Sequence, residues 1–195
     1  MMKLRVLMFT TLGLAALLTG FFALTLYRSM QPPPLPVLGE VPEFQYLTAD
    51  STAFSLDDLR GRYVVVDFIY TSCPTACPVM SSKMKKFYDR YRGQDDVRFV
   101  SFSVDPVNDT FPVLREYAAQ WGIDDDRWVF VRTDTVSISE FCEKGFYLSG
   151  DLPNMHSTRF VLVDPQGRIR GYYDAFDDDQ MKKLQTDLDN LKGGF

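Results

Sequence analysis

The sequence predicts a mixed α/β domain, in which helices flank a central sheet, preceded by a long apolar segment. Strand-like and helix-like stretches alternate through the chain after residue 39. Residues 63–69, with the sequence YVVVDFI, form a nearly continuous apolar run. Such a run is typical of a strand that is buried on both faces. The chain has 195 residues, of which 46% are hydrophobic, enough for one compact domain plus an appendage.

The expected elements follow one another in a regular order. Residues 54–61 form a short turn-like segment that leads into the first strand. Pro78 is compatible with the first turn of the helix that follows this strand. The sequence Asp164–Gly167 predicts a hairpin turn between the last two strands. The expected strands cover residues 63–69, 97–104, 128–131, 158–163 and 168–173, and the expected helices cover residues 78–92, 111–121, 135–146 and 178–191.

This order is the layout of a thioredoxin-like fold, with strand–helix–strand early and a hairpin plus a helix late. It places Cys73 and Cys77 where the first strand turns into the first long helix. The helix dipole and the free backbone N–H groups at a helix N-terminus favour a thiolate over a thiol. We therefore expect the thiol pair to be held partly ready as an anion.

The spacing of Cys73 and Cys77 suits two kinds of chemistry. Two residues four apart lie on the same face of a helix, so both thiols can bind one soft metal ion or form a reversible disulfide. Disulfide oxidoreductases of the thioredoxin type use two intervening residues, whereas here there are three. The longer spacing opens the pair for a metal. A closed structural zinc site would usually need a fourth protein ligand, so this alternative would require Cys142 or an aspartate.

His156 is the only histidine of the chain. It comes just before the expected strand 158–163, in the loop that faces the thiol pair in a thioredoxin-like domain. Two thiolates and one imidazole form a soft donor set that suits Cu(I), and thiolate–imidazole mixtures also hold Cu(II). We expect Cys73, Cys77 and His156 to be the ligands. Cys142 is expected to be a small buried apolar residue, with a role as a third soft ligand as the alternative.

The N-terminal segment predicts a membrane anchor. The run from Val6 to Tyr27 contains no charge, and as a helix it would be about 33 Å long, enough for a bilayer core of about 30 Å. Lys3 and Arg5 precede it, which places the N-terminus in the cytoplasm and the domain outside, in the periplasm or its equivalent. A cleaved signal peptide is the competing interpretation. We expect an anchor in the inner (cytoplasmic) membrane over residues 1–30, a stiff proline-rich linker over 31–38 and the domain over 39–195.

The charge distribution excludes a nucleic-acid-binding protein. The net charge is −5, and no basic residues are clustered as a nucleic-acid face requires. Acidic runs at residues 124–126 and 177–179 are expected to be solvated turns and helix starts, where carboxylates complement the helix dipole.

Four segments carry a family resemblance: Thr71–Pro78 (TSCPTACP), Val104–Thr110 (VDPVNDT), His156–Thr158 (HST) and Asp164–Gly167 (DPQG). With these segments, the chain resembles the Sco/SenC family over residues 39–192. Members of this family are membrane-anchored copper proteins that serve cytochrome c oxidase assembly.

The resemblance implies that Cys73, Cys77 and His156 bind copper and that the two cysteines form a redox-active disulfide. It also implies delivery of copper to the binuclear site in the copper-site subunit of cytochrome c oxidase, or reduction of that site's cysteines. Other copper chaperones or thiol reductants are further candidate partners. Asp105 matches a family aspartate near the metal, although a simple turn start is the alternative. Met155 departs from the acidic or polar residue that many relatives carry there.

Three other functions remain open from the sequence. The same thiol pair would serve a thiol–disulfide oxidoreductase in which His156 only tunes the pair. A peroxiredoxin-like peroxidase would need a threonine three residues before its cysteine, and Thr71 is one residue too close to Cys73. A structural zinc domain is the last alternative. Because carrying copper requires no turnover, enzyme activity is not needed for the first interpretation.

Overall fold

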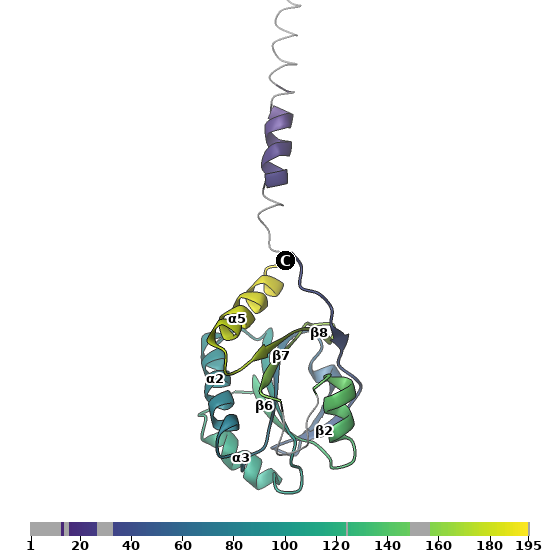
Figure 1. Ribbon diagram of the computed structural model, residues 1–195, viewed down its shortest axis with the longest axis vertical. Helices are drawn as coiled ribbons and strands as arrows, with labels where there is room; N and C mark the ends of the chain where they lie inside the picture. The colour runs from purple at the N-terminus through teal and green to yellow at the C-terminus, as the bar shows by residue number, and fades with distance from the viewer. Residues whose placement is uncertain (1–12, 14–15, 27–32, 124, 149–156, 195) are drawn as a thin grey trace, which may run out of the picture. The chain divides into compact units, whose positions relative to one another are not determined.

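The chain forms a short N-terminal helical unit and a compact unit that spans Leu35–Gly194. The computed structural model describes residues 13, 16–26, 33–123, 125–148 and 157–194 (Figure 1). Within these ranges, no helix combines the length and the apolar character needed to cross a membrane. The anchor predicted for residues 1–30 lies largely outside the described residues and stays a prediction.

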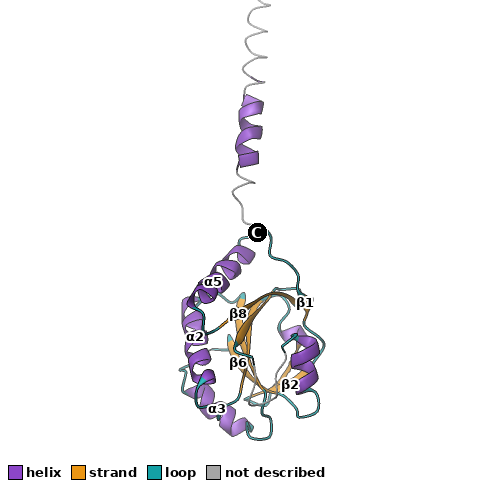
Figure 2. Cartoon of the chain, viewed as in Figure 1, coloured by secondary structure: helices purple, strands orange, loops and turns teal. Residues whose placement is uncertain are grey.

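An eight-stranded sheet forms the centre of the compact unit (Figure 2). Its strands are β1 (Gly39–Glu40), β2 (Gln45–Thr48), β3 (Ala53–Ser55), β4 (Tyr63–Ile69), β5 (Val97–Ser103), β6 (Trp128–Arg132), β7 (Arg159–Val163) and β8 (Arg168–Asp174). They are arranged in the order β1-β8-β7-β4-β5-β6-β2-β3. Strands β4, β5 and β6 are parallel, whereas β7 is antiparallel to β4. The carboxyl ends of β4 and β5 therefore lie at the same edge of the sheet.

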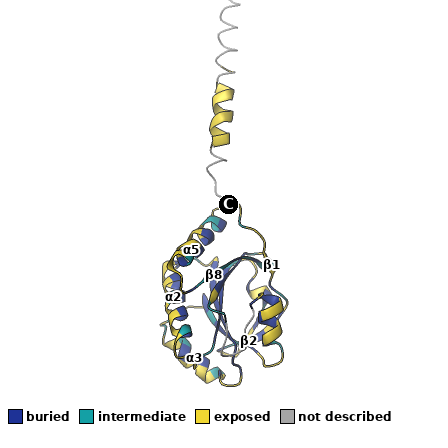
Figure 3. Cartoon of the chain, in the orientation of Figure 1, coloured by how far each residue is buried: buried dark blue, intermediate teal, exposed yellow. Residues whose placement is uncertain are grey.

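Helices cover both faces of this sheet, as Figure 1 shows. The long helices α2 (Ala76–Arg90), α3 (Phe111–Ala119) and α5 (Asp178–Lys192) belong to one side. The short helices η1 (Leu56–Asp58), α4 (Ile138–Glu140) and η2 (Phe141–Gly145, a π-helix) belong to the other. These two layers enclose the sheet and bury its strands (Figure 3).

The residues of β4 alternate between two separate cores, because successive side chains of a strand point to opposite faces. Val65 and Ile69 pack in the core that contains Met80 of α2. Val66 and Phe68 pack in the core on the opposite face. All seven positions of β5 are buried as well. The near-continuous apolar run in the sequence therefore reflects a central strand that is covered on both sides.

The predicted α/β fold is confirmed, with local differences. The bounds of β4 agree with the prediction, and α2 begins two residues earlier than expected, so that Cys77 lies inside the helix. The helix predicted for residues 135–146 begins only at Ile138; residues 135–137 form a turn, in which the carboxylate of Asp134 accepts hydrogen bonds from the backbone N–H groups of Val136 and Ser137. Strands β1, β2 and β3 were not predicted, since they are only two to four residues long.

Candidate metal centre

The thiol pair lies where the chain passes from β4 to α2. We call residues 70–77 the dithiol loop. The backbone N–H of Cys73 donates to the carbonyl of Tyr70 at 3.2 Å and closes a turn at the end of β4. Pro78 is the third residue of α2, where its missing N–H leaves no helical bond unmade. The loop is thus fixed by a strand on one side and a helix start on the other.

Each of the two sulfur atoms accepts a hydrogen bond from a backbone N–H group of the dithiol loop. The N–H of Cys77 donates to Sγ of Cys73 at 3.4 Å, and the N–H of Tyr70 donates to Sγ of Cys77 at 3.5 Å. Both cysteines are buried: Cys73 is 6% exposed and Cys77 is fully covered. The structure therefore brings the predicted pair together, with Cys73 as the more accessible of the two.

Burial governs the acidity of Cys77. It raises the pKa of this thiol well above the ordinary value, and the hydrogen bond from the Tyr70 N–H offsets only part of the increase. The prediction that the helix N-terminus favours the thiolate is therefore wrong for Cys77. A charge on this sulfur would lie in the apolar core, where desolvation outweighs the helix dipole. A bound cation would supply the missing compensation, because a metal deprotonates a coordinating thiol.

Tyr70 is a neighbour of the thiol pair that the sequence analysis missed. A hydrogen bond between its hydroxyl and the sulfur of Cys73 raises the pKa of Tyr70 to about 12. The charge of Asp105 adds to this increase. The one signal in the sequence was the position of Tyr70 directly after a buried strand, at the edge where polar side chains of parallel sheets gather.

Asp105 starts a turn at the end of β5, next to the dithiol loop. Its carboxylate accepts a hydrogen bond from the side-chain amide of Asn108 at 2.7 Å. Its carbonyl accepts one from the N–H of Asp109 at 2.8 Å. Asp105 is therefore a turn residue, as one of the two interpretations of the sequence expected. A role near a metal stays a prediction.

His156 lies outside the described residues, which omit 149–156. In the part of the chain that the structure describes, no group of three histidine, cysteine, aspartate or glutamate side chains is arranged to hold a metal ion. The described residues contribute two soft donors, the sulfur atoms of Cys73 and Cys77. The ligand set with His156 as third member therefore stays a prediction.

Cys142 belongs to the core on the face of the sheet opposite the thiol pair. It lies in η2 between the buried Phe141 and Phe146, and burial raises its pKa to about 12. The interpretation of Cys142 as a small buried apolar residue is confirmed.

Replacing Cys142 by alanine should leave metal binding by the thiol pair unchanged. The substitution removes one buried sulfur atom far from the dithiol loop, so we expect a loss of about 1 kcal/mol in the free energy of unfolding. Copper titration and denaturant unfolding of the variant check both expectations. A lower copper stoichiometry in this variant would support the alternative, that Cys142 is a third soft ligand.

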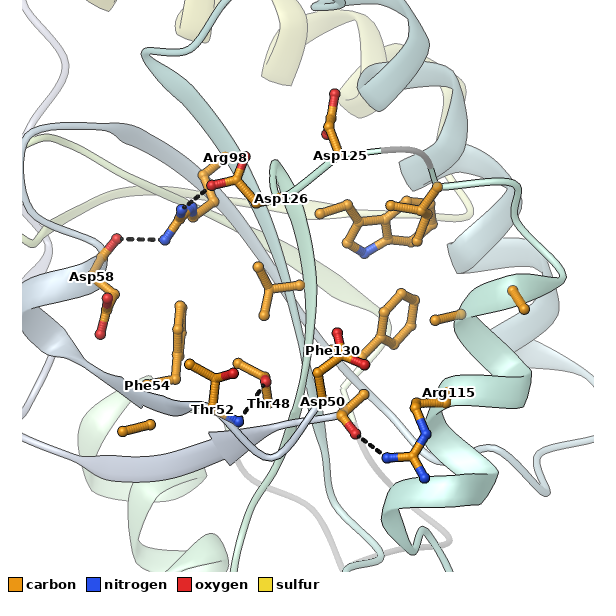
Figure 4. A pocket seen from close by; sticks show the side chains of 17 residues that line it. Thr48, Asp50, Thr52, Phe54, Asp58, Arg98, Arg115, Asp125, Asp126 and Phe130 are labelled. Atoms are coloured by element: carbon orange, nitrogen blue, oxygen red, sulfur yellow. Dashed lines mark hydrogen bonds and ion pairs between the residues drawn. The ribbon is translucent and has the colours of Figure 1, made fainter.

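A cavity of about 710 Å³ lies away from this site, between the β2–β3 hairpin and α3 (Figure 4). Its two guanidinium groups already have partners. Arg98 donates to the carbonyl of Asp58 and pairs with Asp126, and Arg115 donates to the carbonyl of Ala49. Residues of the dithiol loop are not among those that line it. The cavity is therefore separate from the candidate metal centre at Cys73 and Cys77.

The fold and the thiol pair define a thioredoxin-like domain with a dithiol at the start of its first long helix. A sequence model of the SCO1/SenC family matches residues 37–191. The chain belongs to this family. It is 32% identical over 160 residues to the SCO1 protein homolog of Bacillus subtilis, a match that covers 78% of this chain and 83% of that protein.

Two solved structures extend the comparison. BsSco, described as a member of the Sco family of cytochrome c oxidase assembly proteins with a disulfide switch, is 30% identical, with a TM-score of 0.72. That match covers 80% of this chain and 96% of BsSco. Yeast Sco1 with copper bound has a TM-score of 0.62 at 19% identity, over 79% of this chain and 90% of that structure, and supports the fold alone.

Proposed function

We propose that this protein is a copper carrier for the assembly of cytochrome c oxidase. Cys73, Cys77 and His156 hold the copper ion, as Cu(I) when the thiols are reduced and with Cu(II) as a second state. The observation that carries the proposal is the pairing of two buried sulfur atoms, linked through the Cys77 N–H at 3.4 Å. Soft thiolate ligands select Cu(I) among the available metals.

The redox state of the pair controls loading. When Cu(I) binds, both thiols lose their protons to solvent and become thiolates. When a partner disulfide oxidises the pair by exchange, the partner takes up two electrons and two protons as two thiols, and a Cys73–Cys77 disulfide forms, which has no thiolate to offer. The family relation to BsSco, a protein with a disulfide switch, supports this coupling.

The route of transfer follows from the exposure of the two sulfurs. An incoming thiolate must bind copper before the old ligands leave, and Cys73 is the less deeply buried of the two cysteines. The partner is the copper-site subunit of cytochrome c oxidase, with other copper chaperones or thiol reductants as donors. Residues 1–30 anchor the chain in the inner membrane, so that the domain faces the extracytoplasmic side, where the copper site of the oxidase is assembled.

Copper titration of the full-length chain in detergent tests the proposal. We expect the reduced protein to take up one Cu(I) per chain and the oxidised protein to take up none. His156→Ala should weaken binding, since it removes one donor of three. Cys142→Ala serves as a matched control, because it removes a buried thiol from the opposite core. Equal uptake by reduced and oxidised protein would contradict the proposal.

A thiol–disulfide oxidoreductase is the second candidate, because the sulfur of Cys73 accepts a hydrogen bond from the Cys77 N–H, which stabilises a thiolate, and Cys73 is the less deeply buried of the pair. In this case the pair reduces a partner disulfide by exchange: the partner gains two thiols and the Cys73–Cys77 disulfide forms. Efficient reduction of a model disulfide by copper-free protein, unchanged in His156→Ala, would favour this function over copper delivery.

A further inference from the structure

The dithiol loop is connected to the turn that follows β5. The two strands β4 and β5 are parallel neighbours, and the N–H of Val104 donates to the carbonyl of Ile69 at 2.8 Å, one residue beyond β5. The loop with the thiols and the turn 105–109 therefore leave the sheet side by side. Any contact between them fixes the loop relative to the rigid sheet.

Asp109 makes this contact. Its side chain is fully buried, and its carboxylate accepts hydrogen bonds from three donor groups of two residues. The backbone N–H of Thr71 donates to Oδ1 at 3.1 Å, and the hydroxyl of Thr71 donates to the same oxygen at 2.6 Å. The hydroxyl of Ser103 donates to Oδ2 at 2.5 Å. A buried carboxylate needs such donors, because an unpaired charge in the core is strongly destabilising.

Two of the three donor groups belong to Thr71, the second residue of the dithiol loop. The carboxylate of Asp109 therefore fixes both the backbone and the side chain of Thr71. Thr71 lies inside the turn that the Cys73 N–H closes onto the carbonyl of Tyr70. Holding Thr71 in place thus holds Cys73 relative to α2, which carries Cys77. The bond from the Cys77 N–H to Sγ of Cys73 depends on this relative position.

We infer that Asp109 is a positioning residue of the thiol pair: through Thr71 it holds the two sulfurs at the separation that copper binding and disulfide formation require. This inference rests on the proposed function and adds a residue that acts without touching the metal. A thiol pair held in advance loses less conformational entropy when it binds an ion or closes a disulfide.

The test uses Asp109→Asn, Thr71→Val and the double variant, each in the full-length chain. Asp109→Asn replaces one acceptor oxygen by an N–H donor that faces other donors, and Thr71→Val removes the hydroxyl while the N–H remains. We expect each single change to weaken Cu(I) binding about tenfold, the size of effect that loss of one charge-assisted hydrogen bond produces. The double variant should bind Cu(I) no more weakly than Asp109→Asn alone, because both substitutions break the same connection between Thr71 and Asp109.

A second measurement follows the disulfide without copper. In equilibrium with glutathione, the two protein thiols are oxidised to the disulfide while one glutathione disulfide is reduced to two thiols. We expect Asp109→Asn to lower this equilibrium constant about tenfold, which equals a rise of about 30 mV in the reduction potential. Thr71→Ser keeps both the backbone N–H and a side-chain hydroxyl. This variant should therefore have wild-type values of the Cu(I) affinity and of the equilibrium constant with glutathione.

Asp187→Asn is the matched control. Asp187 is also a buried carboxylate, but it accepts from the hydroxyl of Tyr173, between β8 and α5. This variant should be less stable than the wild type, but its Cu(I) affinity and its equilibrium constant with glutathione should both be unchanged. Wild-type constants in Asp109→Asn, or effects that simply add in the double variant, would overturn the inference. Failure of the wild-type protein to bind copper would instead contradict the proposed function, and the disulfide equilibrium would still decide the role of Asp109.

Discussion

Replacing Cys77 by serine abolishes high-affinity copper binding, by our account, and Cys73→Ser does the same. Each substitution removes one of the two thiolates and leaves a hydroxyl, which is a poor ligand for Cu(I). The expected loss is more than about a thousandfold in affinity, the largest effect of any single change in the chain. Competition with a chromogenic Cu(I) chelator measures it directly.

The two serine variants should differ in stability. Cys77 is fully covered, so its replacement by serine buries a hydroxyl in an apolar core and is expected to cost about 1–3 kcal/mol. Cys73 lies at the edge of the same core and should lose less. Cys77→Ala provides the matched control, since it removes the thiol without adding a polar group. Copper affinity within about tenfold of wild type in either serine variant would contradict the site.

The second large effect that we expect concerns Asp67, which makes the free energy of unfolding depend on pH. It lies in β4 on the face that carries Val65 and Ile69, and it is fully buried. Among the described residues, neither carboxylate oxygen has a hydrogen-bond partner. Burial raises the pKa of Asp67 from 3.8 to about 7.

The sign of the effect follows from the two protonation states. Below about pH 4, the Asp67 carboxyl is neutral in both the folded and the unfolded chain, so its burial carries no cost from a charge and it lowers the free energy of unfolding least. Between about pH 4 and the folded pKa of about 7, the unfolded chain loses the proton while the folded chain keeps it, so stability falls as the pH rises. The shift of about three units corresponds to about 4 kcal/mol.

Urea unfolding at about pH 5 and at about pH 8 measures this effect as the difference between wild type and Asp67→Asn. The variant should lack most of the decrease in stability that the wild type shows across this range. Asp164→Asn is a suitable control: burial raises the pKa of Asp164, but hydrogen bonds from Arg170 and Arg168 outweigh it and leave the pKa below its ordinary value. It should therefore destabilise the protein by a similar amount at both pH values. An unchanged pH dependence in Asp67→Asn would refute the assignment.

The main lines of the fold could be predicted because they depend on local patterns. The apolar run of β4 and the turn Asp164–Gly167 between β7 and β8 both have clear signals in the sequence. Strands β1 to β3 could not be predicted in this way. The pairing of β1 with β8 and of β2 with β6 is long-range, whereas β3 pairs with β2 in a local hairpin. All three strands have only two to four residues and are too short for a period of two to be visible.

The site was predictable in its chemistry but not in its surroundings. The spacing of Cys73 and Cys77 predicted that the two residues lie together, and in the structure the N–H of Cys77 donates to Sγ of Cys73. The connection between Thr71 and Asp109 joins residues 38 positions apart, and no pattern in the sequence signals it. The raised pKa of Cys77 depends on how deeply the helix start is buried, which only the packed core determines.

X-ray absorption spectroscopy at the copper edge, on the reduced and copper-loaded full-length chain, tests the central claim most directly. The account predicts two sulfur donors and one imidazole nitrogen around the copper. It also predicts that the imidazole contribution disappears in His156→Ala while both sulfur donors remain. A wild-type spectrum with sulfur donors only, or one that His156→Ala leaves unchanged, would contradict a site built from Cys73, Cys77 and His156.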